Sequence, residues 1–197
     1  MPGSREPPSG TLARMRRAVI VLVIVAIVGG AVALVVTSRP DLDKTRDATA
    51  TAWKPLVVPL SARYVALSAL VNQFDAALAA SGEDNTDLEA MKVALTRWTA
   101  AVKGTDATTM VSAANDLEAR VGQLRSVLDS SARLTQNPAV VAAKKQFDQT
   151  VAPAELVTAY DEAVRKYQRT RESTSKRLVA QVFGYGAIPT FEPSLAT

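Results

Sequence analysis

The sequence predicts an all-α protein, in which an N-terminal transmembrane helix precedes an antiparallel four-helix-bundle-like domain with long first and last helices. Three observations support this fold class. A stretch near the N-terminus is apolar and uncharged over 19 residues, the length of a membrane-spanning helix. Beyond it, apolar residues recur at steps of three and four, the spacing of one helix face. That part of the sequence also lacks the alternation and turn residues that are typical of strands.

The uncharged stretch runs from Ala18 to Val36, and we assign residues 18–37 to a membrane anchor. A helix of this length spans about 28 Å, close to the thickness of the hydrocarbon core of a bilayer. A cleaved signal peptide would need a shorter apolar core and small residues before the cut. Here the core is long and Pro40 follows Arg39, so an uncleaved anchor is the favoured interpretation.

The residues before the anchor, 1–17, are predicted to form a disordered basic tail. Their first part is rich in Pro, Gly and Ser, a composition that buries too little apolar surface to fold. Arginines on this side of the anchor slightly outnumber the basic residues just beyond it. Positive-inside counting therefore predicts a single-pass protein of the cell membrane, with a cytoplasmic N-terminus and an extracytoplasmic domain.

The net charge of +4 does not indicate a nucleic-acid-binding protein. Five of the 23 basic residues and one of the 19 acidic residues lie in 1–39, so residues 40–197 carry 18 of each and are neutral. A nucleic-acid-binding protein concentrates its basic residues on the folded domain. We therefore expect no nucleic-acid partner. The basic excess lies beside the anchor, where the lipid bilayer is the expected partner.

Residues 41–182 are predicted to form the four helices of the domain. The first can follow the anchor almost directly, since only Pro40 intervenes. It ends at Ser81-Gly82, and its apolar stripe is Trp53, Val57, Leu60, Tyr64, Leu67, Val71, Phe74 and Leu78. The second stripe ends before Gly104 and consists of Leu88, Met91, Leu95, Trp98 and Val102.

The third stripe again alternates steps of four and three, and consists of Met110, Ala114, Leu117, Val121, Leu124 and Leu128. The fourth helix is predicted from about Pro138 to Val182, with a kink or a break at Pro153. Its stripe is Phe147, Val151, Val157, Tyr160, Val164, Tyr167, Arg171, Thr174 and Leu178. Four such stripes joined by short connections predict an antiparallel bundle.

Residues 183–197 are predicted to form an aromatic C-terminal tail that packs on the bundle. Two glycines and a proline prevent the last helix from continuing beyond Val182. Four large apolar side chains follow within nine positions: Phe183, Tyr185, Ile188 and Phe191. Leaving each of them in water forfeits about 1.5–3 kcal/mol, so the tail is expected to fold back.

The composition excludes most catalytic and metal-binding chemistry. The sequence contains no His and no Cys, which rules out Ser-His-Asp and Cys-His catalysis and nearly all zinc sites. The glycine-rich phosphate-binding motifs are also missing. Acidic residues are expected on the solvated surface. We therefore expect no catalytic residue, no cofactor and no metal ion, and a protein that is not an enzyme.

Three motifs give the chain a family resemblance. The first helix carries Ala52-Trp53, Leu60, Arg63-Tyr64, Leu67 and Leu70-Val71. Later come QFDQT at 146–150 and then Tyr160, Val164 and Tyr167. The end of the chain carries Leu178-Val179-Ala180, Phe183-Gly184-Tyr185 and Phe191-Glu192. In order and spacing these motifs resemble the LemA family, from Ala18 to Glu192. The resemblance implies a single-pass membrane protein with a helical soluble domain, and it implies no established enzymatic activity.

The chain departs from the family pattern at polar positions. The Asn that follows each tyrosine in the family is Asp161 and Gln168 here, and a Phe-Pro pair in the final helix is Thr174-Ser175. The motif positions to which we assign an interaction role are Trp53, Arg63, Tyr64, Tyr160, Asp161, Tyr167, Arg171, Gly184, Phe191 and Glu192.

Most of these positions also have a purely structural interpretation. Arg63 is expected to pair with an acid such as Asp161 across the bundle rather than to bind a ligand, and the aromatic residues are expected in the core. Arg171 lies in the fourth stripe, where a polar residue often sets register or partner choice. Its basic neighbours form either a solvated helix face or a contact with anionic lipid or an acidic partner: Arg165, Lys166, Arg169, Lys176 and Arg177.

Two functions remain open at this point. The leading prediction is a non-enzymatic, membrane-tethered helical-bundle protein that binds or organises another component of the cell envelope, with a protein partner there. The alternative is a ligand-binding or sensory bundle that signals through its single span. A sensor needs converging polar groups between helices and a continuous helix from span to domain, whereas a scaffold needs an exposed apolar or charged patch. Only 17 residues precede the predicted span, which weighs against autonomous signalling.

Overall fold

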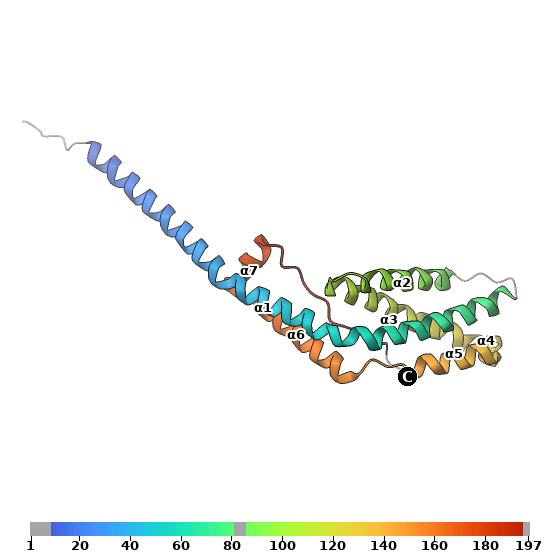
Figure 1. Cartoon of the computed structure of the whole chain (residues 1–197). Coiled ribbons are helices and arrows are strands. Elements are labelled where there is room, and N and C mark those ends of the chain that lie inside the picture. The colour runs from blue at the N-terminus through green and yellow to red at the C-terminus, as the bar shows by residue number, and fades with distance from the viewer. Residues whose placement is uncertain (1–8, 81–85, 195–197) are drawn as a thin grey trace, which may run out of the picture.

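The computed structural model describes residues 9–80 and 86–194. These residues form seven helices and no strand, so the all-α fold class is confirmed. Helix α1 (Ser9–Ala79) runs the length of the molecule, and the other helices pack along it from about Leu34 onward (Figure 1). Helices α2 (Thr86–Val102) and α3 (Ala107–Ser130) pack against each other as a hairpin on this part of α1.

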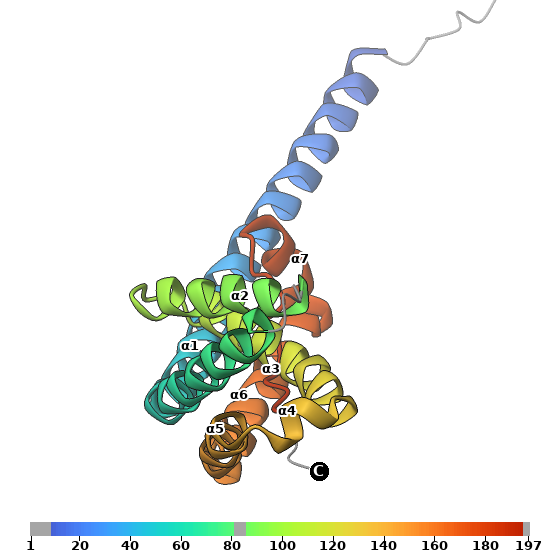
Figure 2. The same ribbon diagram turned by 90° about the vertical axis from the view of Figure 1, so that its right-hand side faces the viewer.

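The chain then returns along α1 in shorter pieces. These are α4 (Ala132–Gln136), α5 (Pro138–Gln149), α6 (Ala154–Glu172) and α7 (Thr174–Val182). Helices α5, α6 and α7 each contact α1, and α7 lies where the projecting N-terminal part of α1 begins (Figures 1 and 2). The packed helices are called the helical body below.

The predicted anchor and the predicted first helix are one continuous helix. Helix α1 has 71 residues and passes through Pro40, Pro55 and Pro59 without a break. Beyond Pro40, Leu42 is fully buried against α7 and the residues after it, and this packing offsets the hydrogen bond that a proline removes. Among the described residues, α1 is the one helix long and apolar enough to cross a membrane.

The predicted disordered tail 1–17 is wrong for residues 9–17, which are helical. This stretch contains Leu, Ala, Met and Arg, which are good helix formers. A helix that is already nucleated extends at low cost through such residues. Residues 1–8 lie outside the described part of the chain.

The first three apolar stripes lie in the core. On α3, every predicted stripe residue from Met110 to Leu128 is buried, and on α1 only Val57 is less than fully buried. On α2, Leu95 and Val102 are half-buried while alanines beside them are buried. The small alanine side chains let α2 approach its neighbours closely, which turns the buried face slightly away from the predicted stripe.

The predicted fourth helix is broken in two places. Residues 150–153 separate α5 from α6, because Pro153 cannot donate a helical hydrogen bond and instead precedes the first turn of α6. A second break at Ser173 separates α6 from α7. Val151 lies in the first break and Leu178 in the helix after the second, and both are exposed rather than buried as the stripe predicted. Arg171 is half-buried and contacts Glu172 at 3.5 Å instead of lying in a helix seam.

Helix α7 ends where the glycine pattern predicts. Gly184 has φ of +70°, a conformation that side chains with a Cβ rarely adopt. The Tyr185 amide donates to the Ala180 carbonyl oxygen at 2.9 Å, which is the six-to-one bond of a Schellman cap. The chain therefore turns back at Gly184 and directs residues 185–194 along the helical body.

Replacing Leu67 or Leu124 with alanine should destabilise the helical body by about 2–5 kcal/mol in each case, because both side chains are buried. Urea unfolding of the purified full-length protein in detergent measures this effect. Lys103→Ala is the control, since Lys103 is exposed and a surface change is worth about 0.5 kcal/mol or less. Similar losses in all three variants would contradict the assignment of the core.

Candidate functional site

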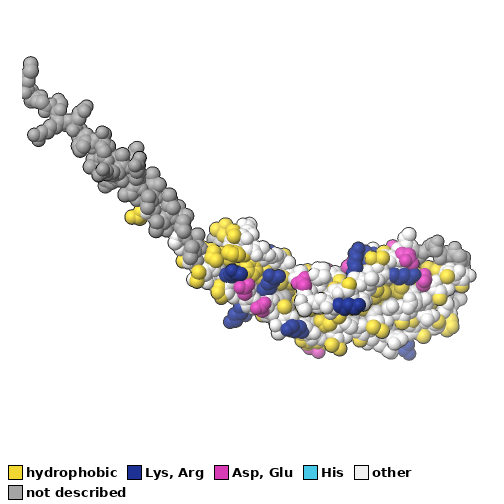
Figure 3. Space-filling view, turned by 45° about the horizontal axis from the view of Figure 1, so that its top comes forward, with side chains coloured by type: hydrophobic (Ala, Val, Ile, Leu, Met, Phe, Trp, Pro, Cys, Tyr) yellow, Lys and Arg dark blue, Asp and Glu magenta, His cyan; other side chains and the backbone are white. Residues whose placement is uncertain are grey.

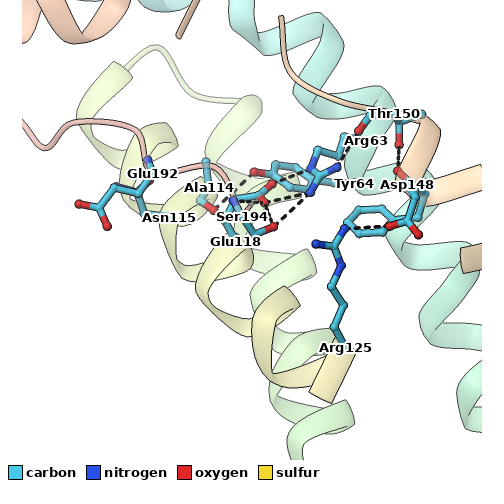
Figure 4. A network of polar contacts seen from close by, with 11 residues as sticks. Arg63, Tyr64, Ala114, Asn115, Glu118, Arg125, Asp148, Thr150, Glu192 and Ser194 are labelled. Atoms are coloured by element: carbon cyan, nitrogen blue, oxygen red, sulfur yellow. Dashed lines mark hydrogen bonds and ion pairs between the residues drawn. The ribbon is translucent and has the colours of Figure 1, made fainter. Parts of the chain in front are cut away.

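A buried ion pair joins α1 to α3 in the middle of the helical body. The Arg63 guanidinium donates from Nε to Glu118 Oε1 at 2.8 Å and from Nη2 to Glu118 Oε2 at 3.1 Å (Figure 4). The two side chains are only 4% and 1% exposed. This two-point geometry is the strongest form of the arginine–carboxylate pair, and burial shields it from salt.

The remaining hydrogen-bonding groups of the pair are satisfied by the chain around it. Arg63 Nη1 donates to the Thr150 carbonyl oxygen at 2.7 Å, at the break between α5 and α6. Both the amide and the hydroxyl of Ser194 donate to Glu118 Oε2, at 3.0 and 2.5 Å. The guanidinium also lies 4.3 Å from the centre of the Phe147 ring, which favours a cation.

The charge state of Glu118 follows from these contacts. Burial raises the pKa of its carboxyl, but the hydrogen bonds and charge of Arg63, together with the Ser194 hydrogen bonds, outweigh burial and hold the pKa below its ordinary value of 4.5. Glu118 is therefore ionised at neutral pH and has no proton to donate. Because Arg63 and Ser194 occupy its oxygens, the arrangement favours structural clamping over proton transfer.

The ion pair lies beneath the C-terminal segment, residues 185–194. Three side chains of α6 donate to carbonyl oxygens of this segment: Tyr160 to Pro189 at 2.8 Å, Tyr167 to Gly186 at 2.8 Å and Gln168 to Ile188 at 3.1 Å. Asp161 accepts from the Phe191 amide at 3.1 Å. Burial raises the pKa of both tyrosine hydroxyls, so both remain protonated donors at neutral pH.

Helix α3 and the core hold the other side of the segment. The Asn115 side chain donates to the Thr190 carbonyl oxygen at 2.8 Å. It also accepts from the Glu192 amide at 3.0 Å, and Figure 4 shows these two residues. Phe191 is buried edge-on against Trp53, with ring centres 5.7 Å apart. Tyr185 and Ile188 are also buried. Trp53 Nε1 is buried without a hydrogen-bond partner, whereas the polar side chains of α3 and α6 that converge here are occupied by the protein's own chain.

Most of the predicted interaction residues meet around this segment. Trp53, Tyr160, Asp161 and Tyr167 contact it, Arg63 lies beneath it, and Gly184, Phe191 and Glu192 start or belong to it. Tyr64 points to α3, where its hydroxyl donates to the Ala114 carbonyl oxygen at 3.4 Å. Arg171 lies apart from the group, at the C-terminal end of α6.

The predicted partner of Arg63 is wrong. Arg63 pairs with Glu118 on α3, and Asp161 on α6 instead accepts a backbone amide. The expectation that acidic residues lie on the solvated surface is also wrong for Glu118. The reason is the placement of the helices: α3 carries a carboxylate to the Arg63 guanidinium, whereas Asp161 faces the C-terminal segment.

Glu118, Asn115 and Ser194 are the residues that sequence reasoning missed. The first two carry a signal, because Val111, Asn115 and Glu118 continue the steps of four and three in a second stripe beside the main one. A polar residue in such a stripe indicates a buried polar contact. Ser194 has no comparable signal, since its place depends on the fold of the C-terminal segment.

Two of the hollows outside this site lie against α2. A groove of about 550 Å³ runs between α1 and α2, with Val65 at its edge and Tyr64 and Trp98 in its lining. A second hollow of about 640 Å³ lies at the α2–α3 turn, lined by Gly104, Asp106 and their neighbours. In the part of the chain that is described, no group of three or more potential metal-ligating side chains occurs.

Comparisons with protein-family models, with curated proteins and with solved structures each found no match to this chain. The resemblance to the LemA family therefore rests on the three sequence motifs, and it stays a prediction. The structure adds what the motif residues contact. Asp161 and Gln168, which depart from the family pattern, both bond the backbone of the C-terminal segment.

Proposed function

We propose that this chain is a non-enzymatic, membrane-tethered protein of the LemA type, which binds or organises another component of the cell envelope. Its transmembrane helix is followed by an antiparallel four-helix-bundle-like domain on the extracytoplasmic side. The observation that carries the proposal is the continuity of α1, which runs from the apolar stretch into the helical body as one helix. A continuous helix holds the body close to the membrane, in a fixed orientation.

A non-enzymatic role agrees with the chemistry of the buried site. The buried charged pair, Arg63 and Glu118, uses its hydrogen bonds to hold helices and the C-terminal segment together. The sequence offers neither a histidine base nor a thiol nucleophile. Binding is thus the activity that the described residues support.

The groove between α1 and α2 is the surface we assign to a protein partner. Val65 lines this groove and is 71% exposed, so its side chain is free to contact a partner. The ring of Tyr64 meets that of Trp98 edge-on at 4.9 Å in the lining, which gives the groove a rigid floor. A helix of another protein can lay an apolar face on such a surface.

A sensory function is the second candidate, and the continuity of α1 also favours it. Movement of the helical body would pass directly into the apolar half of α1. The converging polar groups that a ligand would need are, however, occupied by residues 185–194. Binding through an outer surface therefore remains the leading proposal.

Site-specific photo-crosslinking of the full-length protein in cells tests the leading proposal. A crosslinking residue in place of Val65 should give a discrete adduct with a second protein. The matched control is the same residue in place of Val141, an exposed valine on α5. Absence of an adduct at Val65, or equal adducts at both positions, would contradict a binding role for the groove.

We expect the mature protein to retain residues 1–39. The uncharged run is as long as a membrane span, and Pro40 follows directly after Arg39. The intact mass of the protein extracted from membranes measures this. A species that begins near residues 38–41 would show that the apolar stretch is a cleaved signal and not an anchor.

We also expect the helical body to be digested by a protease that is added outside intact cells with a permeable wall. The reason is the cluster of arginines before the anchor, which favours a cytoplasmic N-terminus. Immunoblotting for a C-terminal tag follows the digestion. Full protection in intact cells, with digestion after lysis, would reverse the orientation.

A further inference from the structure

Helix α7 lies beside α1 at the end of the predicted membrane span. Val179, Ala180 and Tyr185 pack against Leu42, with Leu34 and Val35 at the edge of the same cluster. Lys176 Nζ contacts Asp41 Oδ2 at 2.6 Å. Helix α7 is thus held level with residues 34–42 of α1, which include the last three residues of the uncharged run.

The outer face of α7 is apolar and largely uncovered in the described structure, where only the Arg39 guanidinium lies over it, 5.2 Å from the centre of the Phe183 ring. Leu178 and Val182, four residues apart on one helix face, are 63% and 78% exposed, and Phe183 is 43% exposed. Val36 on the neighbouring part of α1 is exposed as well. Figure 3 shows apolar side chains gathered at this end of the helical body, where the N-terminal part of α1 leaves it.

Basic side chains flank this apolar face. A hollow of about 550 Å³ at the α6–α7 junction is lined by Arg171, Arg177, Gln181 and Tyr185, with Glu172 as its one acidic residue. Along the outer side of α6, Arg165, Lys166 and Arg169 are exposed as well. The acidic residues of α1 in this region are engaged: Asp41 contacts Lys176, and Asp43 contacts Arg39 and the Tyr185 hydroxyl.

This combination is typical of a helix that lies in the membrane interface. Such helices bury an apolar face at the boundary between headgroups and acyl chains, and hold basic residues at the level of the phosphates. The depth of α7 is not adjustable, since α1 is continuous and α7 is packed on it. When the uncharged run spans the bilayer, the apolar face of α7 reaches the bilayer surface.

We propose that α7 is an interfacial helix that seats the helical body on the bilayer. Leu178, Val182 and Phe183 enter the boundary region, and Arg171 and Arg177 bind the phosphate of an anionic lipid headgroup. The proposal rests on the membrane anchoring proposed above. It assigns the basic residues of α6 and α7 to lipid and not to an acidic protein.

The chain has no cysteine, so single cysteines can carry a nitroxide spin label without further changes. We would label the full-length protein as Val182→Cys, reconstituted in vesicles of phosphatidylcholine with about one third phosphatidylglycerol. Electron paramagnetic resonance then compares the collision of the label with oxygen, which enters lipid, and with a neutral nickel complex, which stays in water. Val141→Cys on α5 is the control for an exposed valine far from α7.

The expected result is that the nickel complex reaches the Val182 label at least threefold less than the Val141 label, with oxygen favoured at Val182. Adding Arg177→Gln to the Val182→Cys protein should increase the access of the nickel complex to the Val182 label. Vesicles of phosphatidylcholine alone should have the same effect on the Val182→Cys protein. Equal protection in neutral and anionic vesicles would overturn the assignment of the arginines to an anionic headgroup. Equal nickel access at Val182 and Val141 would overturn the interfacial helix altogether.

A third label separates this proposal from the anchor on which it rests. Val23 is an exposed residue of the uncharged run, and Val23→Cys should be shielded from the nickel complex if α1 spans the bilayer. Shielding at Val23 together with free access at Val182 would contradict only the interfacial helix. Free nickel access at Val23 would contradict the anchor, and the interfacial helix with it.

Discussion

Replacing Glu118 with alanine is expected to destabilise the protein by about 3–5 kcal/mol, because the variant leaves the Arg63 guanidinium buried without its counter-charge. Two hydrogen bonds from Ser194 are lost in the same change. Urea unfolding of the full-length protein in detergent measures the loss. Glu162→Ala on α6 is the matched control, since Glu162 is exposed, and its effect should be about 0.5 kcal/mol or less.

A double variant tests whether the unpaired charge causes this loss. Arg63→Met combined with Glu118→Leu removes both charges, and apolar pairs of similar volume often replace a buried ion pair at little cost. The double variant should therefore be clearly more stable than the sum of the two single losses predicts. Strictly additive losses would contradict a direct interaction between Arg63 and Glu118.

The same pair gives stability a defined dependence on pH. Because the folded pKa of Glu118 lies below its ordinary value of 4.5, the folded state binds this proton less readily than the unfolded state does. The contribution of ionised Glu118 to the free energy of unfolding is complete above pH 4.5. It is lost as the pH falls through the lowered pKa of Glu118 in the folded state. Glu118→Gln should be less stable than the native protein at pH 7, and the difference should narrow in acid. A constant difference between pH 7 and pH 3 would contradict the ionised pair.

The apolar stripes predicted which faces are buried but not which helices meet. Steps of three and four identify the inner face of α1 and α3 because the helix period fixes that face regardless of partner. The partner of Arg63 depends on how helices are arranged across the body, which the period does not encode. For this reason the sequence favours Asp161 as the partner, whereas the buried carboxylate is Glu118.

Helix boundaries could be predicted where a residue enforces them. Gly104, Pro153 and Gly184 each lie at or beside a helix end, because proline cannot donate a helical hydrogen bond and glycine is unfavourable inside a helix and adopts conformations closed to other residues. The break at Ser173 has no such residue and separates α6 from α7 in a stretch of polar residues. The exposed positions of Leu178 and Val182 follow from that break, so the outer face of α7 could not be predicted from the stripe.

The site around residues 185–194 was predictable only in its apolar part. Large side chains in the tail indicated that it folds back, and Tyr185, Ile188 and Phe191 are buried. Its polar contacts were not indicated, because they join side chains of α3 and α6 to backbone atoms. Backbone groups carry no sequence signature, so such contacts become visible only in the structure.

Replacing Phe191 with alanine is expected to destabilise the protein by about 3–5 kcal/mol, since it removes a buried aromatic side chain at the centre of the C-terminal segment. Phe191 is 2% exposed and lies against Trp53. The matched control is Phe183→Ala, which removes the same atoms from a side chain that is 43% exposed. Its effect in detergent-solubilised protein should be several-fold smaller.

Hydrogen exchange of the full-length protein shows which part of the chain the Phe191→Ala substitution loosens. In the native protein the Phe191 amide is bonded to Asp161, and the Tyr185 amide is bonded to Ala180, so both should exchange slowly. In Phe191→Ala the Phe191 position should lose its protection, because the segment leaves α6. The Tyr185 amide should keep most of its protection, since the Schellman cap is made within α7 and its own turn.

Truncation after Phe183 is the complementary change. It removes the buried side chains of Tyr185, Ile188 and Phe191 and leaves Asn115, Asp161 and Glu118 without their bonds to the segment. Both losses act in the same direction, so the truncated protein should be at least as unstable as Phe191→Ala. Rapid exchange of every amide from Gly184 to Phe191 in the native protein, together with unchanged stability on truncation, would show that the segment is not part of the folded core.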